Sequence, residues 1–194
     1  MGKLSTREKI IEIADQLFYE QGYEFTSFAH IAEKVGISRG NFYHHFKTKD
    51  DILEAVIQKR LVDREALLSN WEKDAKTPKE RILLYTRILI FNQDKILQFG
   101  CPVGTLTSEL SKLDHPMTDQ AGSIMTLFRE WLKSQFLQYG FQESEADDHA
   151  LHVLAWSQGV ATLANTFKDT DFVNREVAGI SQWLDEALLS LSTQ

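Results

Sequence analysis

Hydrophobic side chains recur every three to four residues along most of this chain, which is the spacing of amphipathic helices. The pattern is clearest in residues 25–49, which read FTSFAHIAEKVGISRGNFYHHFKTK. Ser27 is placed to cap a helix that Gly36 ends, and Ser38 is placed to cap a second short helix over 39–45. Two short helices across a glycine-containing turn of this length predict a helix-turn-helix, whose second helix enters the DNA major groove.

The second short helix carries the side chains that we expect to contact DNA. Arg39 and Asn41 can read base edges through paired hydrogen bonds, while Tyr43 and His44 can reach phosphates, sugars or thymine methyl groups. Two lysines follow where the next helix begins, and cationic side chains at a helix N-terminus favour phosphate. The predicted DNA-binding residues are Thr26, Ser27, Ser38, Arg39, Gly40, Asn41, Tyr43, His44, Lys47 and Lys49.

The same residues resemble a known family. Residues 5–55 are similar, without a gap, to the N-terminal signature of the TetR family of one-component repressors. The resemblance implies a homodimeric, all-helical regulator whose C-terminal domain binds a small molecule and thereby controls affinity for a DNA operator. The positions that carry it are Thr26, Ile31, Ala32, Val35, Gly36, Gly40, Tyr43, His44, Phe46 and Lys49.

Two other interpretations of this stretch are open. Residues 36–40 match G-x-S-x-G, the nucleophile elbow of α/β-hydrolases, which requires a strand before the serine and a helix after it. The residues before Ser38 have helical spacing instead, so we do not expect an enzyme. The stretch could also be a helical hairpin used only for packing, but the polar side chains of the second helix would then have no purpose.

Charge is distributed in a way that permits DNA binding. The 194-residue chain has a formal charge of −7, yet residues 1–50 hold seven Lys/Arg against seven Asp/Glu. The whole deficit therefore lies in the remaining chain, and residues 25–49 hold four cationic side chains against one acidic side chain. DNA binding needs a local cationic face rather than a basic protein.

Localisation follows from what the sequence lacks. No apolar run approaches the roughly 20 residues of a membrane span, and no secretory signal is apparent. The single cysteine, Cys101, excludes an internal disulfide framework and fits a reducing compartment. We expect a cytoplasmic protein.

The remaining hydrophobic pattern predicts an all-α protein of about nine helices. A capping box opens the first helix at Ser5, and Thr48 caps a fourth helix that links two domains. Tyr23 and Phe25 are expected to plug the base of the first domain. The predicted division is a helix-turn-helix DNA-binding domain over residues 1–48 and an effector-binding and dimerisation domain over residues 49–194.

The last two predicted helices, about 144–167 and 172–191, are candidates for a dimer interface. The TetR resemblance implies a four-helix bundle there, with two helices from each subunit. An ordinary intrachain core is the other interpretation, and the pattern does not separate them. The predicted interface residues are Val153, Trp156, Val160, Ala164, Val177, Ile180 and Leu184.

An effector site is expected in the C-terminal domain. Phe91, Trp131 and Trp156 indicate an apolar cavity, although core packing is the commoner use of such side chains. Cys101 precedes a predicted helix start, where the helix dipole favours a thiolate. It is therefore either an electrophile sensor or a buried small side chain, and the effector is expected to be apolar, aromatic or electrophilic.

Metal binding is not expected. Asp147, Asp148, His149 and His152 are close in sequence, but a tight site would need further ligands from elsewhere, so a solvated acidic turn is the better interpretation. No cofactor is predicted either.

The sequence favours a ligand-responsive transcriptional regulator, a repressor released from a palindromic operator by its effector. The alternative is a helical-bundle binding protein or enzyme without a DNA role. The effector, the operator, the regulated genes and the sign of regulation are not encoded in any pattern that we recognise.

Overall fold

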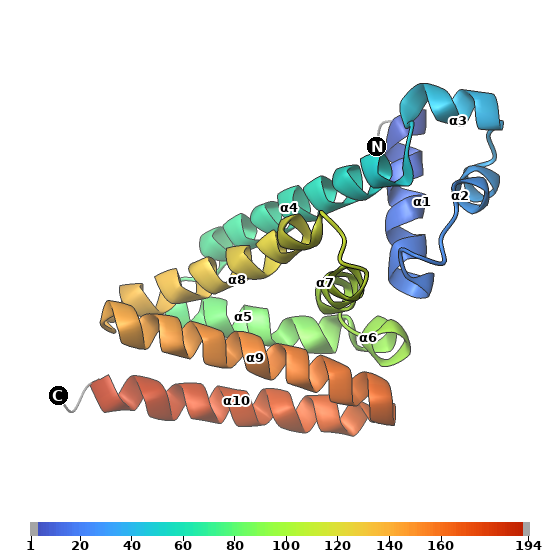
Figure 1. Cartoon of the computed structure of the whole chain (residues 1–194). Helices are drawn as coiled ribbons and strands as arrows, with labels where there is room; N and C mark the ends of the chain where they lie inside the picture. The colour runs from blue at the N-terminus through green and yellow to red at the C-terminus, as the bar shows by residue number, and fades with distance from the viewer. Residues whose placement is uncertain (1–3, 192–194) are drawn as a thin grey trace. The chain divides into compact units, whose positions relative to one another are not determined.

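Residues 4–191, the part that the computed structural model describes, form ten helices and no strand (Figure 1). None of these helices is long and apolar enough to cross a membrane. The first five are α1 (Thr6–Gln21), α2 (Phe28–Val35), α3 (Arg39–His45), α4 (Lys49–Asp74) and α5 (Pro78–Phe91). The others are α6 (Gln93–Phe99), α7 (Pro102–Lys112), α8 (Thr118–Tyr139), α9 (Glu143–Phe167) and α10 (Thr170–Leu191).

The chain divides into two compact units. The first contains the chain up to Arg64 together with Thr105–Ser123, and the second contains Glu65–Gly104 and the described residues from Ile124 onward. The first unit therefore includes most of α7 in addition to α1, α2 and α3. The predicted functional boundary at residue 48 stays a prediction.

The core of the first unit joins helices that are distant in sequence. Ile10 and Phe18 from α1, Ile31 from α2 and Phe42 from α3 are buried in one cluster. Leu110 of α7 lies in the same cluster, so α7 contributes to the core beneath the helix-turn-helix. The predicted capping box at the start of α1 is confirmed, since the backbone N–H and side chain of Ser5 exchange hydrogen bonds with Glu8.

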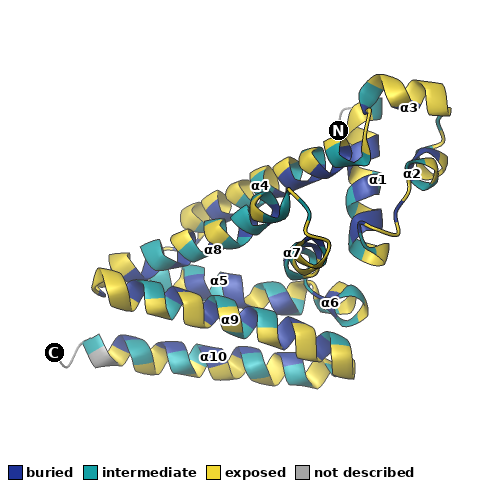
Figure 2. Ribbon diagram, in the orientation of Figure 1, coloured by how far each residue is buried: buried dark blue, intermediate teal, exposed yellow. Residues whose placement is uncertain are grey.

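The second unit is built largely from α5, α6, α9 and α10. The helix α10 packs against α5 and α9, and α6 packs against α9. Figure 2 shows buried faces on these helices alternating with exposed ones, as amphipathic helices require. One core cluster consists of Leu89, Ile96, Val160, Ala161, Ala164, Val173 and Val177.

Two details differ from the sequence prediction. There is one helix more than expected, because the stretch from Pro78 to Leu97 is interrupted at Asn92, which ends α5 and precedes α6. Phe25 was expected to plug the first domain, but its side chain is 85% exposed. The buried aromatic residue of that turn is its neighbour Tyr23.

The residues predicted for the dimer interface belong mostly to the core of their own chain. Trp156 is the exception, because it is partly exposed. This arrangement is the intrachain interpretation that the sequence left open, and a side chain buried in this way has no surface left for a second subunit. The buried residues are Val153, Val160, Ala164, Val177, Ile180 and Leu184.

Candidate nucleic-acid interface

The two short helices have the predicted caps and the predicted turn. The Ser27 hydroxyl accepts a hydrogen bond from the His30 N–H at 3.1 Å and begins α2. Gly36 ends α2 in the left-handed conformation, with φ of 76°, which a residue without a Cβ adopts at little cost. Ser38 then caps α3 by accepting the Asn41 N–H at 3.3 Å. The geometry is that of a helix-turn-helix.

The helix α3 is amphipathic over only two turns. Phe42 is 1% exposed and packs edge-on against Phe28 of α2, with ring centroids 4.9 Å apart. This contact anchors α3 to α2 and turns the opposite face of α3 toward solvent. The exposed residues of that face include Arg39, Gly40, Asn41, Tyr43 and His44.

Ser38 has a structural use that does not fit the hydrolase interpretation. Its hydroxyl caps α3, and the residue pattern before it is helical, since α2 ends at Val35. A nucleophile elbow needs a strand in that place. The G-x-S-x-G match is therefore a coincidence of turn chemistry.

Two of the predicted DNA-binding residues stabilise the turn between α1 and α2. Thr26 is 1% exposed, and its hydroxyl donates a hydrogen bond to the Gly22 carbonyl at 2.7 Å. Lys49 donates from Nζ to the Tyr23 carbonyl at 3.0 Å, and Nζ lies 4.0 Å from the centroid of the Tyr23 ring. Both side chains therefore position α2, and a direct DNA contact by either of them stays a prediction.

The loop from α3 to α4 is ordered by a carboxylate. One oxygen of Asp51 accepts the N–H groups of Lys47 and Thr48, at 2.9 and 2.8 Å. These backbone hydrogen bonds, that of Thr48 first, hold the pKa of the Asp51 carboxyl below its usual value. Lys47 itself is exposed at the end of α3, and its Nζ donates to the Tyr43 carbonyl.

Glu109 of α7 is a residue of this unit that the sequence interpretation missed. Its carboxylate accepts the backbone N–H of Tyr23 at 2.9 Å and that of Glu24 at 3.0 Å. The turn before α2 is therefore held through its N–H groups by Glu109 and through its carbonyls by Lys49. No local pattern links positions 86 residues apart, so no sequence signal could have identified this contact.

A hydrogen-bonded cluster fixes Tyr23 below the same turn. Its hydroxyl donates to Asp50, and the imidazole of His115 lies 3.5 Å from the same carboxylate oxygen. The rings of Tyr23 and His115 meet edge to face. Burial, and then the hydrogen bond to Asp50, raises the pKa of the Tyr23 phenol far above its usual value. Tyr23 is thus a neutral core donor throughout the physiological range.

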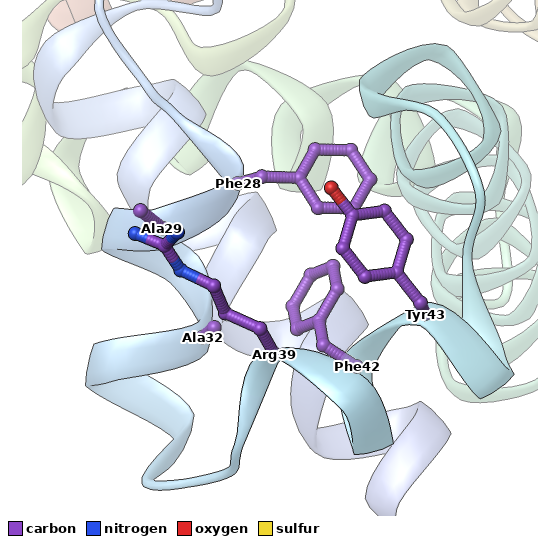
Figure 3. Close-up of a pocket in the computed structure, with 6 residues that line it drawn as sticks. All are labelled: Phe28, Ala29, Ala32, Arg39, Phe42 and Tyr43. Carbon is purple, nitrogen blue, oxygen red and sulfur yellow. The ribbon is translucent and has the colours of Figure 1, made fainter.

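A hollow of about 200 Å³ opens between α2 and α3. Figure 3 shows the Arg39 side chain along one side of it and the rings of Phe28 and Tyr43 along another. The ring planes of Phe28 and Tyr43 are nearly parallel, at 18°, with centroids 5.5 Å apart. The full lining is Phe28, Ala29, Ala32, Arg39, Phe42 and Tyr43.

The four residues predicted to bind an effector do not gather at one point in the second unit. Phe91 is 73% exposed at the end of α5. Trp131 donates from its indole N–H to Glu72 at 2.9 Å and contacts Trp71. Cys101 and Trp156 pack against one common cluster around α6, α9 and α10. Their role in binding stays a prediction.

The acidic and histidine residues near the start of α9 have other uses. Asp147 forms an ion pair with Arg129 at 2.5 Å, and His149 lies among aromatic rings, including those of Phe141 and Trp183. Within residues 4–191 no group of three or more His, Cys, Asp or Glu side chains could hold a metal ion.

A helix-turn-helix with an exposed polar recognition helix, joined to a second helical unit, defines a DNA-binding regulator. Comparison with known proteins gives the family. Residues 10–56 match the family of bacterial regulatory proteins called tetR, and residues 89–176 match the C-terminal domain of LmrA/YxaF-like transcriptional regulators. The chain belongs to the TetR family of transcriptional regulators, as its N-terminal residues suggested, and this is a family of regulators rather than enzymes.

Individual relatives agree with this assignment. An uncharacterized HTH-type transcriptional regulator of Lactococcus lactis is 35% identical over 117 residues, which is 57% of each chain. The uncharacterized regulator YxaF of Bacillus subtilis is 29% identical over 84% of this chain and 87% of its own length. A TetR regulator from Legionella pneumophila has a similar structure, with a TM-score of 0.81 and 25% identity over 94% of this chain and 98% of its own.

Proposed function

We propose that this protein is a dimeric repressor that binds a palindromic operator and is released by a small-molecule effector in its second unit. The observation that carries the proposal is α3, a capped two-turn helix anchored by Phe42 with Arg39, Asn41, Tyr43 and His44 exposed together. Two such helices, one turn of DNA apart, would read two half-sites. Such regulators work in the cytoplasm, where the DNA lies.

Individual contacts follow from side-chain chemistry. Arg39 is suited to guanine, whose O6 and N7 accept a bidentate guanidinium, and Asn41 is suited to adenine. Tyr43, His44, Lys47 and the backbone at the start of α2 are suited to phosphates, which fix position without reading sequence. The proposal thus separates residues that set base preference from residues that set affinity.

The dimer is proposed to form through the exposed faces of α9 and α10. On α9 these are Leu151, Ala155, Gly159 and Leu163, spaced along one side of the helix, and Leu163 is 43% exposed. A Cβ built on Gly159 meets no atom within 4 Å, so a second helix could approach there closely. Exposed apolar residues that share a helix face indicate an interaction surface.

The effector is proposed to be apolar, aromatic or electrophilic. Supporting this, Cys101 directly precedes α7, its sulfur lies 3.4 Å from the Gly104 N–H, and α7 also carries Glu109. An adduct at Cys101 would disturb the first turn of α7. This helix also carries Glu109, whose carboxylate accepts N–H groups of the turn between α1 and α2.

Treating the protein with a small quinone should weaken operator binding, and Cys101→Ser should bind DNA without responding to the quinone. A response by the serine variant would mean that the effector binds elsewhere.

The test of the whole proposal is selection of DNA from a random pool by the full-length protein. A palindromic consensus with tight, sequence-dependent binding supports the repressor. A protein that selects no sequence, yet binds or converts small molecules, would instead be the helical-bundle binding protein or enzyme that the sequence allowed.

A further inference from the structure

The hollow between α2 and α3 opens to solvent along the side of α3 that faces α2. Ala29, Arg39 and Tyr43 are exposed at its rim, while Ala32 and Phe42 are buried beneath it. Figure 3 shows these side chains arranged around an open centre. A base edge that Arg39 contacts would therefore lie next to this hollow.

Contacts among the aromatic rings hold the walls of the hollow. Phe28 packs edge-on against Phe42 and stacks on Tyr43, so three rings form a fixed corner. The alanines of α2 leave the space, since a longer side chain at position 29 would occupy it. A prearranged apolar corner binds without the cost of ordering its side chains.

The chemistry of the lining selects one group of DNA. Four of the six lining residues are apolar, while the polar groups of Arg39 and Tyr43 belong to exposed residues at the rim. A polar group pushed past the rim against Phe28, Ala32 and Phe42 would lose hydration there, whereas an apolar group would gain from the same contact. The apolar group that the major groove offers is the C5-methyl of thymine. We infer that the hollow receives the C5-methyl group of a thymine in each half-site, beside the base pair that Arg39 contacts. This inference rests on the proposed DNA-binding function.

Size and position agree with that occupant. A hollow needs only about 10–15 Å³ of accessible volume to hold one water-sized group, so 200 Å³ accommodates a methyl group and the adjoining edge of the pyrimidine ring. Arg39 lines the same hollow, and neighbouring bases are about 3.4 Å apart. The Arg39 side chain would therefore lie beside the methyl group and also contact the neighbouring base pair.

The experiment removes the methyl group alone. In the operator selected by the wild-type protein, each thymine of one half-site is replaced in turn by deoxyuridine or by 5-bromodeoxyuridine, whose halogen resembles a methyl in size. We expect one position at which deoxyuridine weakens binding about three- to tenfold and bromine restores it. Fluorescence anisotropy with short duplexes gives the dissociation constants.

Protein variants tie that position to the hollow. Ala29→Leu fills the hollow from an exposed position of α2, and leucine is nearly as good a helix former as alanine. We expect this variant to lose the difference between thymine and deoxyuridine at that position only, whereas Ala29→Ser keeps it.

Three outcomes would overturn the inference: a half-site without thymine, equal affinity for deoxyuridine at every position, or an unchanged penalty in Ala29→Leu. If the hollow held a phosphate instead, removal of the methyl would change nothing. Failure of the protein to select any DNA is a separate result, which rejects the proposed function itself.

Discussion

The carboxylate of Glu109 accepts the backbone N–H of Tyr23 at 2.9 Å, which joins α7 to the turn that precedes α2. Its second oxygen accepts the next N–H, that of Glu24, at 3.0 Å. The same turn contains Thr26 and leads into Ser27, the cap of α2. A displacement of α7 would therefore act directly on the backbone that sets where α2 begins.

Replacing Glu109 with alanine should loosen this turn. Two N–H groups would lose a charged acceptor in a partly buried place, which costs about 1–3 kcal/mol. Urea denaturation should show the loss of stability, and operator affinity should fall with it. Glu109→Gln retains one amide oxygen and should lose about half as much. Equal stability of the alanine variant and the wild type would mean that the hydrogen bonds contribute nothing.

Arg39 and Lys47 should affect DNA binding in different ways. Arg39→Ala removes a base contact and should cost about 1–3 kcal/mol on the preferred operator while relaxing base preference at one position. Lys47→Ala removes a phosphate contact, so it should weaken binding to every sequence and lower the salt dependence of log K by about one. Both variants lose one positive charge, so net charge cannot explain a difference. Titrations of both variants on operator and scrambled DNA at several salt concentrations test this difference. If the two variants show the same loss of affinity on both DNAs and the same salt dependence, Arg39 and Lys47 do not have separate roles in base recognition and phosphate binding.

The helix-turn-helix could be predicted from sequence because its signals are local. Ser27, Gly36 and Ser38 each contact backbone groups only three or four residues away, so a short stretch of sequence includes both the capping residue and its partner. Lys49 and Glu109 differ, since each bonds a turn far away in sequence. The fold adds that Lys49 donates a hydrogen bond to the Tyr23 carbonyl, which no local pattern indicates, while a phosphate contact by Lys49 stays a prediction.

The dimer interface shows a second limit of the sequence. The apolar stripes of α9 and α10 are candidates either for the interface or for an intrachain core, and residues such as Val160 and Leu184 are buried in their own chain. Hydrophobic spacing identifies which face of a helix is buried, but it cannot say whether the partner is the same chain or another copy. The weaker, partly small-residue face on α9 is the one left exposed.

A charge on that exposed face should separate the subunits. Ala155→Glu would place an unpaired carboxylate at the proposed interface and cost several kcal/mol, raising the dissociation constant of the dimer more than a hundredfold. Thr126→Glu, at an exposed position of α8, is the matched control. Sedimentation velocity gives the oligomeric state, and circular dichroism confirms that both variants fold. A dimer of unchanged stability in Ala155→Glu would place the interface elsewhere.

His149 should make the protein less stable in mild acid. Burial lowers the pKa of its imidazole; the nearby Glu145 and Asp148 oppose this effect, and His152 adds to it. The folded protein thus favours the neutral ring, which packs against Phe141 and Trp183. The unfolded chain takes up the proton first, as the pH falls through the ordinary histidine pKa near about 6.5. Stability should therefore decrease from about pH 7 downward, and the decrease due to His149 should stop below the pKa of the folded state.

The substitution His149→Phe tests this origin of the pH dependence. Phenylalanine keeps an aromatic ring among the same neighbours but cannot bind a proton, so the melting temperature should change less between pH 7.5 and pH 5.5 than in the wild type. His44→Phe, at an exposed position of α3, controls for the loss of one histidine. Thermal melts followed by circular dichroism at half-unit pH intervals provide the comparison. If His149→Phe and the wild type lose the same number of degrees over that range, other groups cause the acid sensitivity, and the buried imidazole is not its source.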